Sequence, residues 1–139
     1  MSCMASTAKT DTLTVRSGTR ADAIDITDRV QHLVRESGVK SGLCHLYVPH
    51  TTAGVFINEN ADPEALADIL HTLEALVPWD NDYRHAEGNA AAHIKSTLVG
   101  TSQTLPVRDG GLALGRWQGI YFVDFDGPRE RHLQVTVLA

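Results

Sequence analysis

The chain has 139 residues, of which 42% are hydrophobic, and a formal net charge of −5. This length predicts one domain, residues 1–139, with a single buried core. The negative charge, without a dense run of Lys and Arg, argues against a nucleic-acid-binding protein. No segment has the pattern of a signal peptide or the length needed to span a bilayer, so we expect a cytoplasmic protein with no membrane attachment. We expect residues 1–11 to be disordered or extended.

Alternation and capping patterns predict the first elements. Residues 12–16 alternate polar and apolar side chains, as a strand does. A helix is predicted to open at residues 25–28 with Thr27 as its N-cap and to end at Gly38, because an apolar stripe lies between them: Val30, Leu33 and Val34. Residues 43–48 form a second predicted strand, in which Cys44 is a small buried hydrophobe rather than part of a disulfide framework.

A polar segment, a strand and a helix follow one another between residues 50 and 63. Residues 53–57 form a predicted buried strand, so the polar residues before and after it lie at its two ends. Asp62 is placed to cap the next helix, with Pro63 at the first helical position. A catalytic acid is the alternative for Asp62. Apolar residues at helical spacing continue this helix until Pro78: Leu66, Ile69, Leu70, Leu73 and Leu76.

The second half of the chain predicts a polar loop, a short helix and several strands. Residues 79–87 form the loop, and a helix follows with Asn89 as its cap and Gly100 as its terminator. A hairpin turn at residues 108–111 joins a strand before it to a long strand after it, residues 112–125, and a last strand ends the chain. Strands outnumber helices and the late strands are hairpin-connected, so the predicted fold class is α+β, a largely antiparallel sheet or sandwich with packed helices.

Seven short segments carry most of the polar and glycine-containing motifs: His50-Thr51-Thr52-Ala53, Asn58-Glu59-Asn60, Tyr83-Arg84-His85, Asn89, His93-Ile94-Lys95, Gly115-Arg116-Trp117-Gln118 and Asp126-Gly127-Pro128-Arg129. Together they resemble the YjbQ family (UPF0047), also called the secondary thiamine-phosphate synthase family. The likeness runs from about Thr12 to the C-terminus. The chain departs from the family pattern at Arg116, where the family has threonine, which puts in doubt any role for that hydroxyl.

The resemblance implies a compact α+β protomer that assembles as a homotrimer. It also implies a divalent metal, commonly zinc, held by histidines. The implied activity is a weak thiamine-phosphate synthase reaction, which joins a pyrimidine-methyl diphosphate to a thiazole phosphate with release of pyrophosphate. The expected partner is therefore a small phosphorylated metabolite.

Three histidines are the candidate metal ligands. Zinc binds neutral imidazole nitrogens, and a catalytic site combines three protein ligands with one open position. His50, His85 and His93 lie beside the densest polar motifs, whereas the other candidates are expected on solvated surfaces: His32, His71 and His132. No sequential zinc motif forces the three to converge. The alternative is that His85 and His93 are surface or hydrogen-bonding residues.

The remaining candidates are catalytic and substrate-binding side chains. Glu59 is the candidate general base, or a carboxylate that orients a ligand histidine, and a solvated acid is the alternative. Arg129 and Arg131 are candidates for bidentate contacts with a phosphate, and exposed surface arginines are the alternative. Further predicted substrate contacts are Thr51, Thr52, Asn89, Lys95, Ser96 and Thr97. Trp117 with Gln118 could form a stacking wall for a heteroaromatic ring, and a core indole is the alternative.

Three functions remain open from the sequence. The leading one is a metal-dependent transferase of the thiamine-phosphate synthase type. The second is metal-assisted hydrolysis of a small phosphorylated metabolite, with Glu59 accepting a proton from zinc-bound water. The third is a non-catalytic metabolite-binding or assembly protein.

Overall fold

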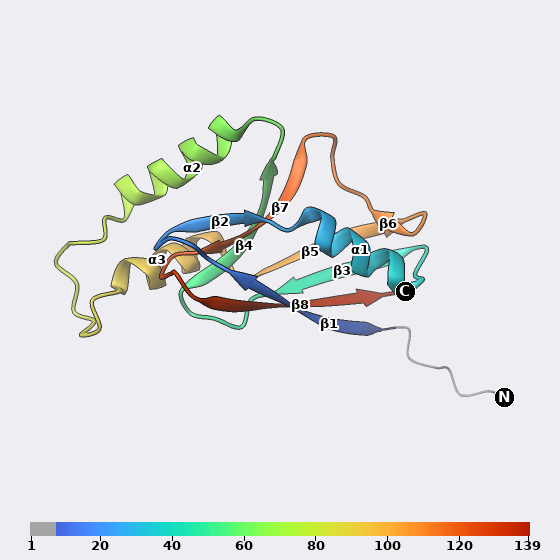
Figure 1. Cartoon of the computed structure of the whole chain (residues 1–139), viewed down its shortest axis with the longest axis horizontal. Coiled ribbons are helices and arrows are strands. Elements are labelled where there is room, and N and C mark those ends of the chain that lie inside the picture. Colours follow the sequence, from blue (N-terminus) through green and yellow to red (C-terminus); the bar gives the residue numbers. More distant parts are fainter. Residues whose placement is uncertain (1–7) are drawn as a thin grey trace.

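The computed structural model describes residues 8–139, and the expectation for residues 1–7 lies outside them. In the described residues the strands form two antiparallel sheets (Figure 1). The large sheet has the order β1 (Lys9–Arg16), β8 (Glu130–Leu138), β3 (Gly42–Tyr47), β5 (Ser102–Arg108), β6 (Gly111–Leu112). The small sheet has the order β2 (Asp22–Asp25), β7 (Gln118–Asp124), β4 (Ala53–Glu59). The helices are α1 (Thr27–Ser37), α2 (Pro63–Leu76) and α3 (Ala90–Val99). The predicted α+β class is confirmed.

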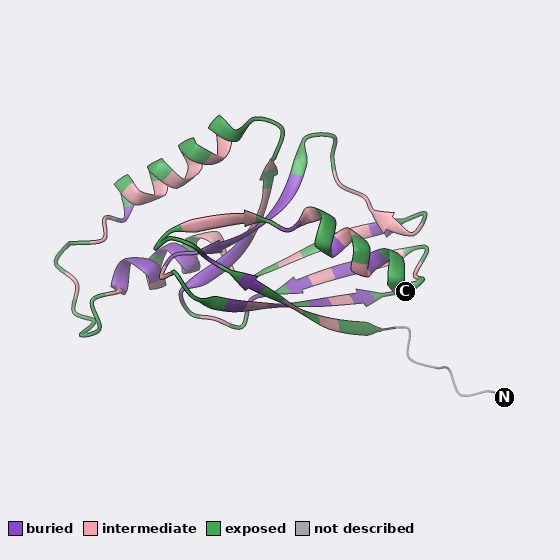
Figure 2. Ribbon diagram, in the orientation of Figure 1, coloured by how far each residue is buried: buried purple, intermediate pink, exposed green. Residues whose placement is uncertain are grey.

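The main core lies between the two sheets and α1. Alternate residues of the large sheet face inward and pack against Val30 and Val34 of α1, and against Val55 and Phe122 of the small sheet. Cys44 belongs to this core, and burial raises the pKa of its thiol to about 11, so the prediction of a small buried hydrophobe is confirmed. Figure 2 shows this pattern as buried residues along the central strands. The small sheet is therefore held rigidly from one side.

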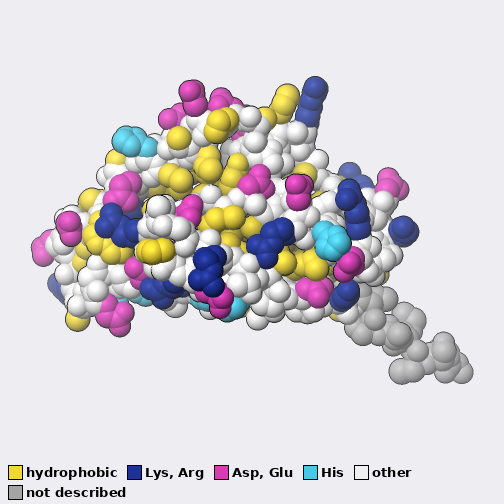
Figure 3. All heavy atoms as spheres, in the orientation of Figure 1, with side chains coloured by type: hydrophobic (Ala, Val, Ile, Leu, Met, Phe, Trp, Pro, Cys, Tyr) yellow, Lys and Arg dark blue, Asp and Glu magenta, His cyan; other side chains and the backbone are white. Residues whose placement is uncertain are grey.

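The other face of the small sheet packs against α2 and α3. Ala92, Val123 and Phe125 form a smaller core, which Leu70 and Leu73 of α2 cover in part. α2 itself has no buried residue, and Leu76, which the predicted apolar stripe included, is 71% exposed. Hydrophobic side chains are accordingly visible along α2 on the molecular surface (Figure 3). The prediction of a helix is confirmed, but its apolar stripe is only partly buried.

The helix ends follow the predicted signals with one exception. Gly38 ends α1 in the left-handed conformation, with φ of 72°. Asp62 caps α2 by accepting a hydrogen bond from the backbone N–H of Glu64 at 2.9 Å. Thr27 was expected to cap α1, but the cap position is Ile26, and the Asp25 carboxylate accepts hydrogen bonds from the N–H and hydroxyl of Thr27. The Thr27 prediction is therefore wrong by one residue, since the acid before it supplies the acceptor.

Two strand predictions also need correction. The predicted long strand at residues 112–125 is two strands, β6 and β7, which belong to different sheets. The sequence analysis missed β2, whose four residues pair with the end of β7. β1 begins at Lys9, so residues 9–11 are a paired part of the large sheet. Among residues 8–139, none of the three helices has the length and hydropathy that a bilayer crossing requires.

Candidate functional site

A polar pocket of about 370 Å³ opens at the end of the small sheet where β4 begins and β7 ends. Three segments line it, and they are distant in sequence: Pro49, His50, Thr51 and Thr52 before β4, Glu87, Asn89 and His93 around the start of α3, and Asp126, Arg129 and Arg131 around the turn into β8. We call it the His50–His93 pocket. Seven of the predicted site residues line it: His50, Thr51, Thr52, Asn89, His93, Arg129 and Arg131.

A close contact between backbones places α3 beside the pocket. The Val55 N–H donates a hydrogen bond to the Gly100 carbonyl at 3.1 Å. A Cβ on Gly54 would lie only 2.6 Å from that same carbonyl oxygen, so only glycine fits there without a shift. The Ser96 hydroxyl adds a bond of 2.6 Å to the carbonyl of Thr51. The end of α3 is thus fixed against β4, which sets the position of His93.

A buried ion pair forms one wall of the pocket. Asp124 is fully buried and accepts two hydrogen bonds from the guanidinium of Arg131, at 3.0 and 2.8 Å. Arg131 also donates to the hydroxyl of Thr52 at 2.6 Å, and Ser17 donates to Asp124 at 2.7 Å. Burial alone would raise the pKa of Asp124, but the hydrogen bonds from Arg131 and Ser17 outweigh it and hold the pKa below its usual range. These hydrogen bonds fix the guanidinium of Arg131 in one orientation, and the residue is only 3% exposed.

Arg129 is held at the rim of the pocket. Its Nε and Nη2 donate to the carbonyl and carboxylate of Asp126, both at 3.0 Å. The same carboxylate accepts a bond of 2.9 Å from Asn89 Nδ2, which fixes the orientation of that amide. Asn89 was predicted to cap α3 and holds the cap position, but its side chain makes no cap hydrogen bond. Its Oδ1 atom is buried and has no hydrogen-bond partner among residues 8–139.

His50 is held in one protonation form by the backbone of β8. Its Nε2 accepts a hydrogen bond of 2.9 Å from the N–H of His132, so a neutral His50 carries its proton on Nδ1. The rings of His50 and His132 stack with centroids 6.2 Å apart. Burial, together with the nearby charges of Arg131 and His132, lowers the pKa of His50. His132 was expected on a solvated surface, and this expectation overlooked its contact with His50.

The predicted metal ligands are only partly brought together. The rings of His85 and His93 meet edge to face with centroids 4.9 Å apart, and His93 shares the pocket with His50. The Nε2 lone pair of His50 is already used by the hydrogen bond to His132. Within residues 8–139 no group of three or more His, Cys, Asp or Glu side chains is placed to hold a metal ion. As they stand in one chain, the three histidines do not fit a zinc site, and zinc stays a prediction of the family resemblance.

Three predicted phosphate donors, Lys95, Ser96 and Thr97, serve the structure of α3 instead. Lys95 is 3% exposed and forms an ion pair with Glu74 of α2, on the side of α3 that faces away from the pocket. The Thr97 hydroxyl donates to the carbonyl of His93, one turn earlier in the helix, and the Ser96 hydroxyl shares its one proton between the carbonyls of Thr51 and His93. These placements correct the predicted roles of Lys95 and Ser96, because ion pairing and helix hydrogen bonds already use their donors.

Glu59 lies at the opposite end of β4. The register pairs Glu59 with Gln118, whereas Ala53, next to the pocket, pairs with Asp124. Seven residues of strand separate these ends, which corresponds to roughly 20 Å at about 3.3 Å per residue. Within one chain Glu59 is therefore too far from the His50–His93 pocket to act as its base. Its predicted catalytic role and that of Asp62, whose side chain caps α2, have no support from this placement.

Trp117 and Gln118 also lie at this far end. The indole of Trp117 is 55% exposed, so the core alternative is wrong, and the guanidinium of Arg116 lies 4.9 Å from the ring centre. Gln118 accepts a hydrogen bond of 2.8 Å from the Gly115 N–H and closes the turn before β7. Burial and the negative charges of Asp25 and Glu59 raise the pKa of the adjacent Tyr121 hydroxyl. Any stacking wall made by Trp117 would face a separate surface.

The sequence analysis missed several residues that shape the pocket. Asp124, the partner of Arg131, lies inside an apolar strand, and a lone acid between valine and phenylalanine was the available signal. Asp126 belongs to a turn motif and Glu87 to the predicted loop, and neither position by itself indicates a site residue. Both line the pocket because the chain turns back there between β7 and β8.

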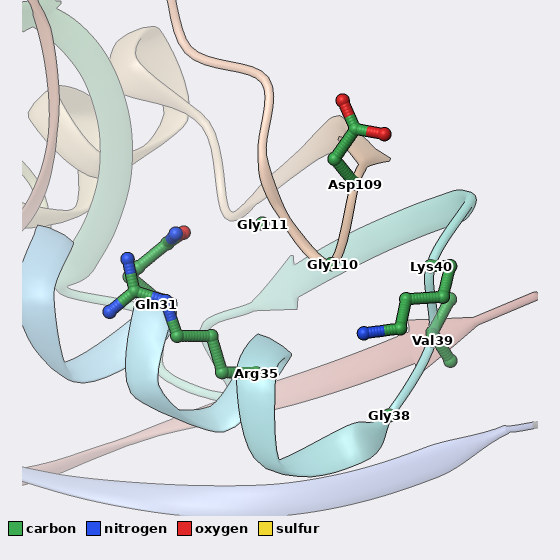
Figure 4. A pocket seen from close by; sticks show the side chains of 8 residues that line it. All are labelled: Gln31, Arg35, Gly38, Val39, Lys40, Asp109, Gly110 and Gly111. Carbon is green, nitrogen blue, oxygen red and sulfur yellow. The ribbon is translucent and has the colours of Figure 1, made fainter.

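A second pocket of about 290 Å³ lies between the end of α1 and the turn that joins β5 to β6 (Figure 4). Lys40 extends its amine toward the space beside Arg35 and Gln31, whereas the carboxylate of Asp109 points away. Gln31 accepts a hydrogen bond from the Leu112 N–H at 2.8 Å, so it ties β6 to α1. None of the predicted site residues lines this pocket. Its two cationic residues, Arg35 and Lys40, are exposed to solvent.

Comparisons with known proteins agree with the resemblance found in the sequence. The family model for UPF0047 protein YjbQ-like matches residues 11–139. A UPF0047 protein of Methanocaldococcus jannaschii is 48% identical over 124 residues, 89% of this chain and 90% of that protein. The UPF0047 protein YugU of Bacillus subtilis is 48% identical over 128 residues, 91% of this chain and 97% of that protein.

Solved structures give the same answer for the fold. A YjbQ/UPF0047 family protein of Clostridium acetobutylicum has a TM-score of 0.90 and 47% identity, and the match covers 92% of this chain and 99% of that one. A YbjQ-like protein of Sulfolobus solfataricus has a TM-score of 0.90 and 35% identity, with coverage of 94% and 96%. These relatives are described by family and not by activity.

Proposed function

Because the chain belongs to the YjbQ family of UPF0047 proteins, we propose that it is an enzyme that binds a small phosphorylated metabolite in the His50–His93 pocket. One observation carries the proposal. Arg129 and Arg131 both line the pocket, and the hydrogen bonds that hold their guanidinium groups within residues 8–139 use Nε and Nη2 but not Nη1. Two fixed guanidinium groups with donors left over are suited to phosphate oxygens.

The reaction implied by the family resemblance is the finer part of the proposal. In that reaction the carbon–oxygen bond to the diphosphate of a pyrimidine-methyl diphosphate breaks, and the same carbon bonds to the ring nitrogen of a thiazole phosphate. Pyrophosphate leaves with the electron pair, so negative charge grows on its oxygens. Arg129 and Arg131 would stabilise that charge, and the proton on Nδ1 of His50 is available to donate to an oxygen. Each of these groups is oriented before a substrate binds.

A metabolite-binding protein without turnover is the second candidate. The placement of Glu59 favours it, since the predicted base lies a whole strand away from the pocket in the same chain. The same placement weighs against the hydrolase, which needs a base beside a metal-bound water. Zinc would supply Lewis-acid chemistry if further ligands completed a site around the histidines. Activity is therefore measured with and without zinc.

We also propose the homotrimer that the resemblance implies. The outer face of the large sheet leaves three large hydrophobic side chains partly uncovered: Leu43, Tyr47 and Leu138. Leu43 and Leu138 are direct partners across β3 and β8, so they form one patch. α2 is the second incompletely covered element. Light scattering at micromolar concentration tests this assembly, and a monomeric mass would contradict it.

The proposed function is tested with Arg129→Gln and the matched control Arg116→Gln. Arg116 is an arginine at the far end of β7 and does not line the pocket. We measure thiamine-phosphate formation and pyrophosphate release from the two substrates, with and without zinc. Arg129→Gln should lower kcat/KM by roughly tenfold to a hundredfold, the value of one or two charge-assisted hydrogen bonds, and the control should not. Binding of the substrates without product would support the binding protein, and equal activity of both variants would contradict the pocket.

A further inference from the structure

The loop between β1 and β2 packs directly against the turn between β7 and β8, which carries Arg129 (Figure 1). The Ser17 N–H donates a hydrogen bond to the carbonyl of Arg129 at 3.0 Å, and the Gly127 N–H donates to the carbonyl of Arg20 at 2.9 Å. A Cβ on Gly127 would lie only 2.4 Å from the hydroxyl oxygen of Ser17, so only glycine lets the two segments approach this closely. The loop therefore supports the turn that carries Arg129.

Ser17 lies at the centre of this contact. The residue is 4% exposed and does not line the His50–His93 pocket. Its hydroxyl donates its one proton to the carboxylate of Asp124 at 2.7 Å and accepts a hydrogen bond from the N–H of Arg129 at 2.9 Å. Asp124 in turn accepts hydrogen bonds from Nε and Nη2 of Arg131. One hydrogen bond thus links the hydroxyl to the backbone of Arg129, and two in series link it to the guanidinium of Arg131.

We infer that Ser17 is a positioning residue of the His50–His93 pocket, whose hydroxyl sets the placement of Arg129 relative to Arg131 and with it the affinity for phosphate. The inference rests on the proposed function, since the placement of the two arginines matters only if they bind phosphate. Two guanidinium groups act together on one phosphate only while their donors keep a suitable separation. Without the hydroxyl, the two supports of that separation are weakened at the same time.

A purely structural role is the other explanation for a buried serine. The Asp124 carboxylate accepts four hydrogen bonds: two from Arg131, one from the N–H of Asp126 at 2.9 Å and one from Ser17. It would keep three of them without Ser17, so the buried ion pair survives. The N–H of Arg129, in contrast, has no other acceptor within residues 8–139. The loss of the hydroxyl therefore acts mainly on the turn that carries Arg129.

Phosphorus NMR titration with inorganic phosphate, which measures weak binding, tests the inference. Ser17→Ala should weaken phosphate binding by roughly tenfold, because displacing a positioned group by about 1 Å can cost as much as about a hundredfold. Val107→Ala is the matched control, since this buried valine of β5 belongs to the core and does not line the pocket. It should lower the thermal stability without changing the phosphate affinity. Circular dichroism shows whether each variant is folded at the temperature of the titration.

A double variant separates positioning from a general loss of stability. In an Arg129→Gln background, Ser17→Ala should weaken phosphate binding by only roughly threefold, because one of the two arginines that it positions is already absent. Independent effects would instead multiply. If Ser17→Ala does not fold, Ser17→Cys takes its place, since a thiol has a similar shape but hydrogen-bonds weakly, and it should weaken phosphate binding in the same way.

The outcomes distinguish this inference from the proposed function. If the unaltered protein does not bind phosphate, the proposed function fails and the inference fails with it. If the unaltered protein binds phosphate and a folded Ser17 variant binds it equally well, Ser17 is only structural and the phosphate pocket stands. The inference is also wrong if Val107→Ala weakens phosphate binding as much as Ser17→Ala does, or if the effects of Ser17→Ala and Arg129→Gln multiply.

Discussion

The two ends of the paired strands β4 and β7 hold their polar side chains in different ways. At the end that adjoins the His50–His93 pocket, Asp124, Arg131 and Thr52 are buried and bonded to one another. At the other end, Trp117 is mostly exposed and Glu59 is half-buried, and neither forms a side-chain hydrogen bond in the described residues. The pocket end therefore holds its polar side chains in one buried set of hydrogen bonds, whereas at the far end Trp117 and Glu59 are not held in this way.

This difference shows how a strand divides a motif. Residues 50–63 form one polar-rich stretch in sequence, yet β4 carries its first part to the pocket and its second part about a strand length away. Residues that are distant in sequence complete the pocket. Asp126 and Arg129 lie between β7 and β8, and this turn brings them next to the beginning of β4. Proximity along the chain is therefore a poor guide to a site that contains a strand.

The largest expected effect is on stability at the pocket end. Asp124→Asn removes the charge that compensates Arg131 in a buried position, so the free energy of unfolding should fall by about 3–5 kcal/mol. Asp25→Asn at the far end is the control, and it should cost less than about 1 kcal/mol because Asn can still accept the bonds from Thr27. Urea denaturation followed by circular dichroism measures both. If the two variants lost the same free energy of unfolding, the buried polar set at the pocket end would be no more important for stability than the polar residues at the far end.

The same carboxylate should make stability depend on acid. The pKa of Asp124 is lower in the folded chain than in the unfolded one, where an aspartate titrates near 3.9. Its stabilising contribution is therefore complete above about pH 4 and is lost as the pH falls through the lower, folded pKa. Unfolding measured between pH 7 and pH 2 should show this loss, and Asp124→Asn should flatten the curve below pH 4. If the free energy of unfolding of Asp124→Asn fell with pH as steeply as that of the unaltered protein, groups other than Asp124 would cause the acid sensitivity.

A smaller effect is expected at the helix that follows the far end. Asp62→Ala removes the side-chain cap of α2 and should lower the free energy of unfolding by about 1 kcal/mol. Asp62→Asn keeps an acceptor at the same place and should restore most of that loss. If instead both variants lose turnover without a loss of stability, the catalytic reading of Asp62 would regain support.

The smallest effect is expected for Glu59→Gln. The substitution keeps the shape of a half-buried side chain far from the pocket, so stability should change by less than about 0.5 kcal/mol and inorganic phosphate affinity should not change. The sequence analysis expects a base here, whose loss would lower turnover by roughly 10²–10⁴-fold. A loss of that size with unchanged phosphate binding would mean that Glu59 of a neighbouring copy reaches the pocket.

Local signals predicted the elements well. Gly38, Asp62 with Pro63, and Gly100 each mark a helix end by a backbone requirement that no distant residue alters. β2 was missed because its four residues, Asp22–Asp25, show no alternation and are strands only through pairing with β7. Residues 112–125 look like one strand because apolar side chains occur on both sides of the break.

The candidate site was predicted only in part, because its residues are brought together by tertiary packing and not by local signals. The polar motifs around them identified His50 and His93, and its place after a turn identified Arg131, and all three line the pocket. Orientation was not predictable: Lys95 and Arg131 are equally suited to phosphate, and only tertiary packing turns the first toward Glu74. Asp124, the partner of Arg131, was missed although its apolar neighbours were a signal of burial, because the sequence does not say which cation pairs with a buried acid.

The glycine joint between β4 and α3 has a consequence for redesign of this scaffold. Gly54 and Gly100 fix the helix through main-chain atoms, so the outward side chains of Ile94 and Leu98 are not needed to hold His93 in place. A library that varies residues 94 and 98 can therefore explore new ligands while the anchoring geometry stays constant. Residue 54, by contrast, must be excluded from any such library, because even alanine there would force the two backbones apart.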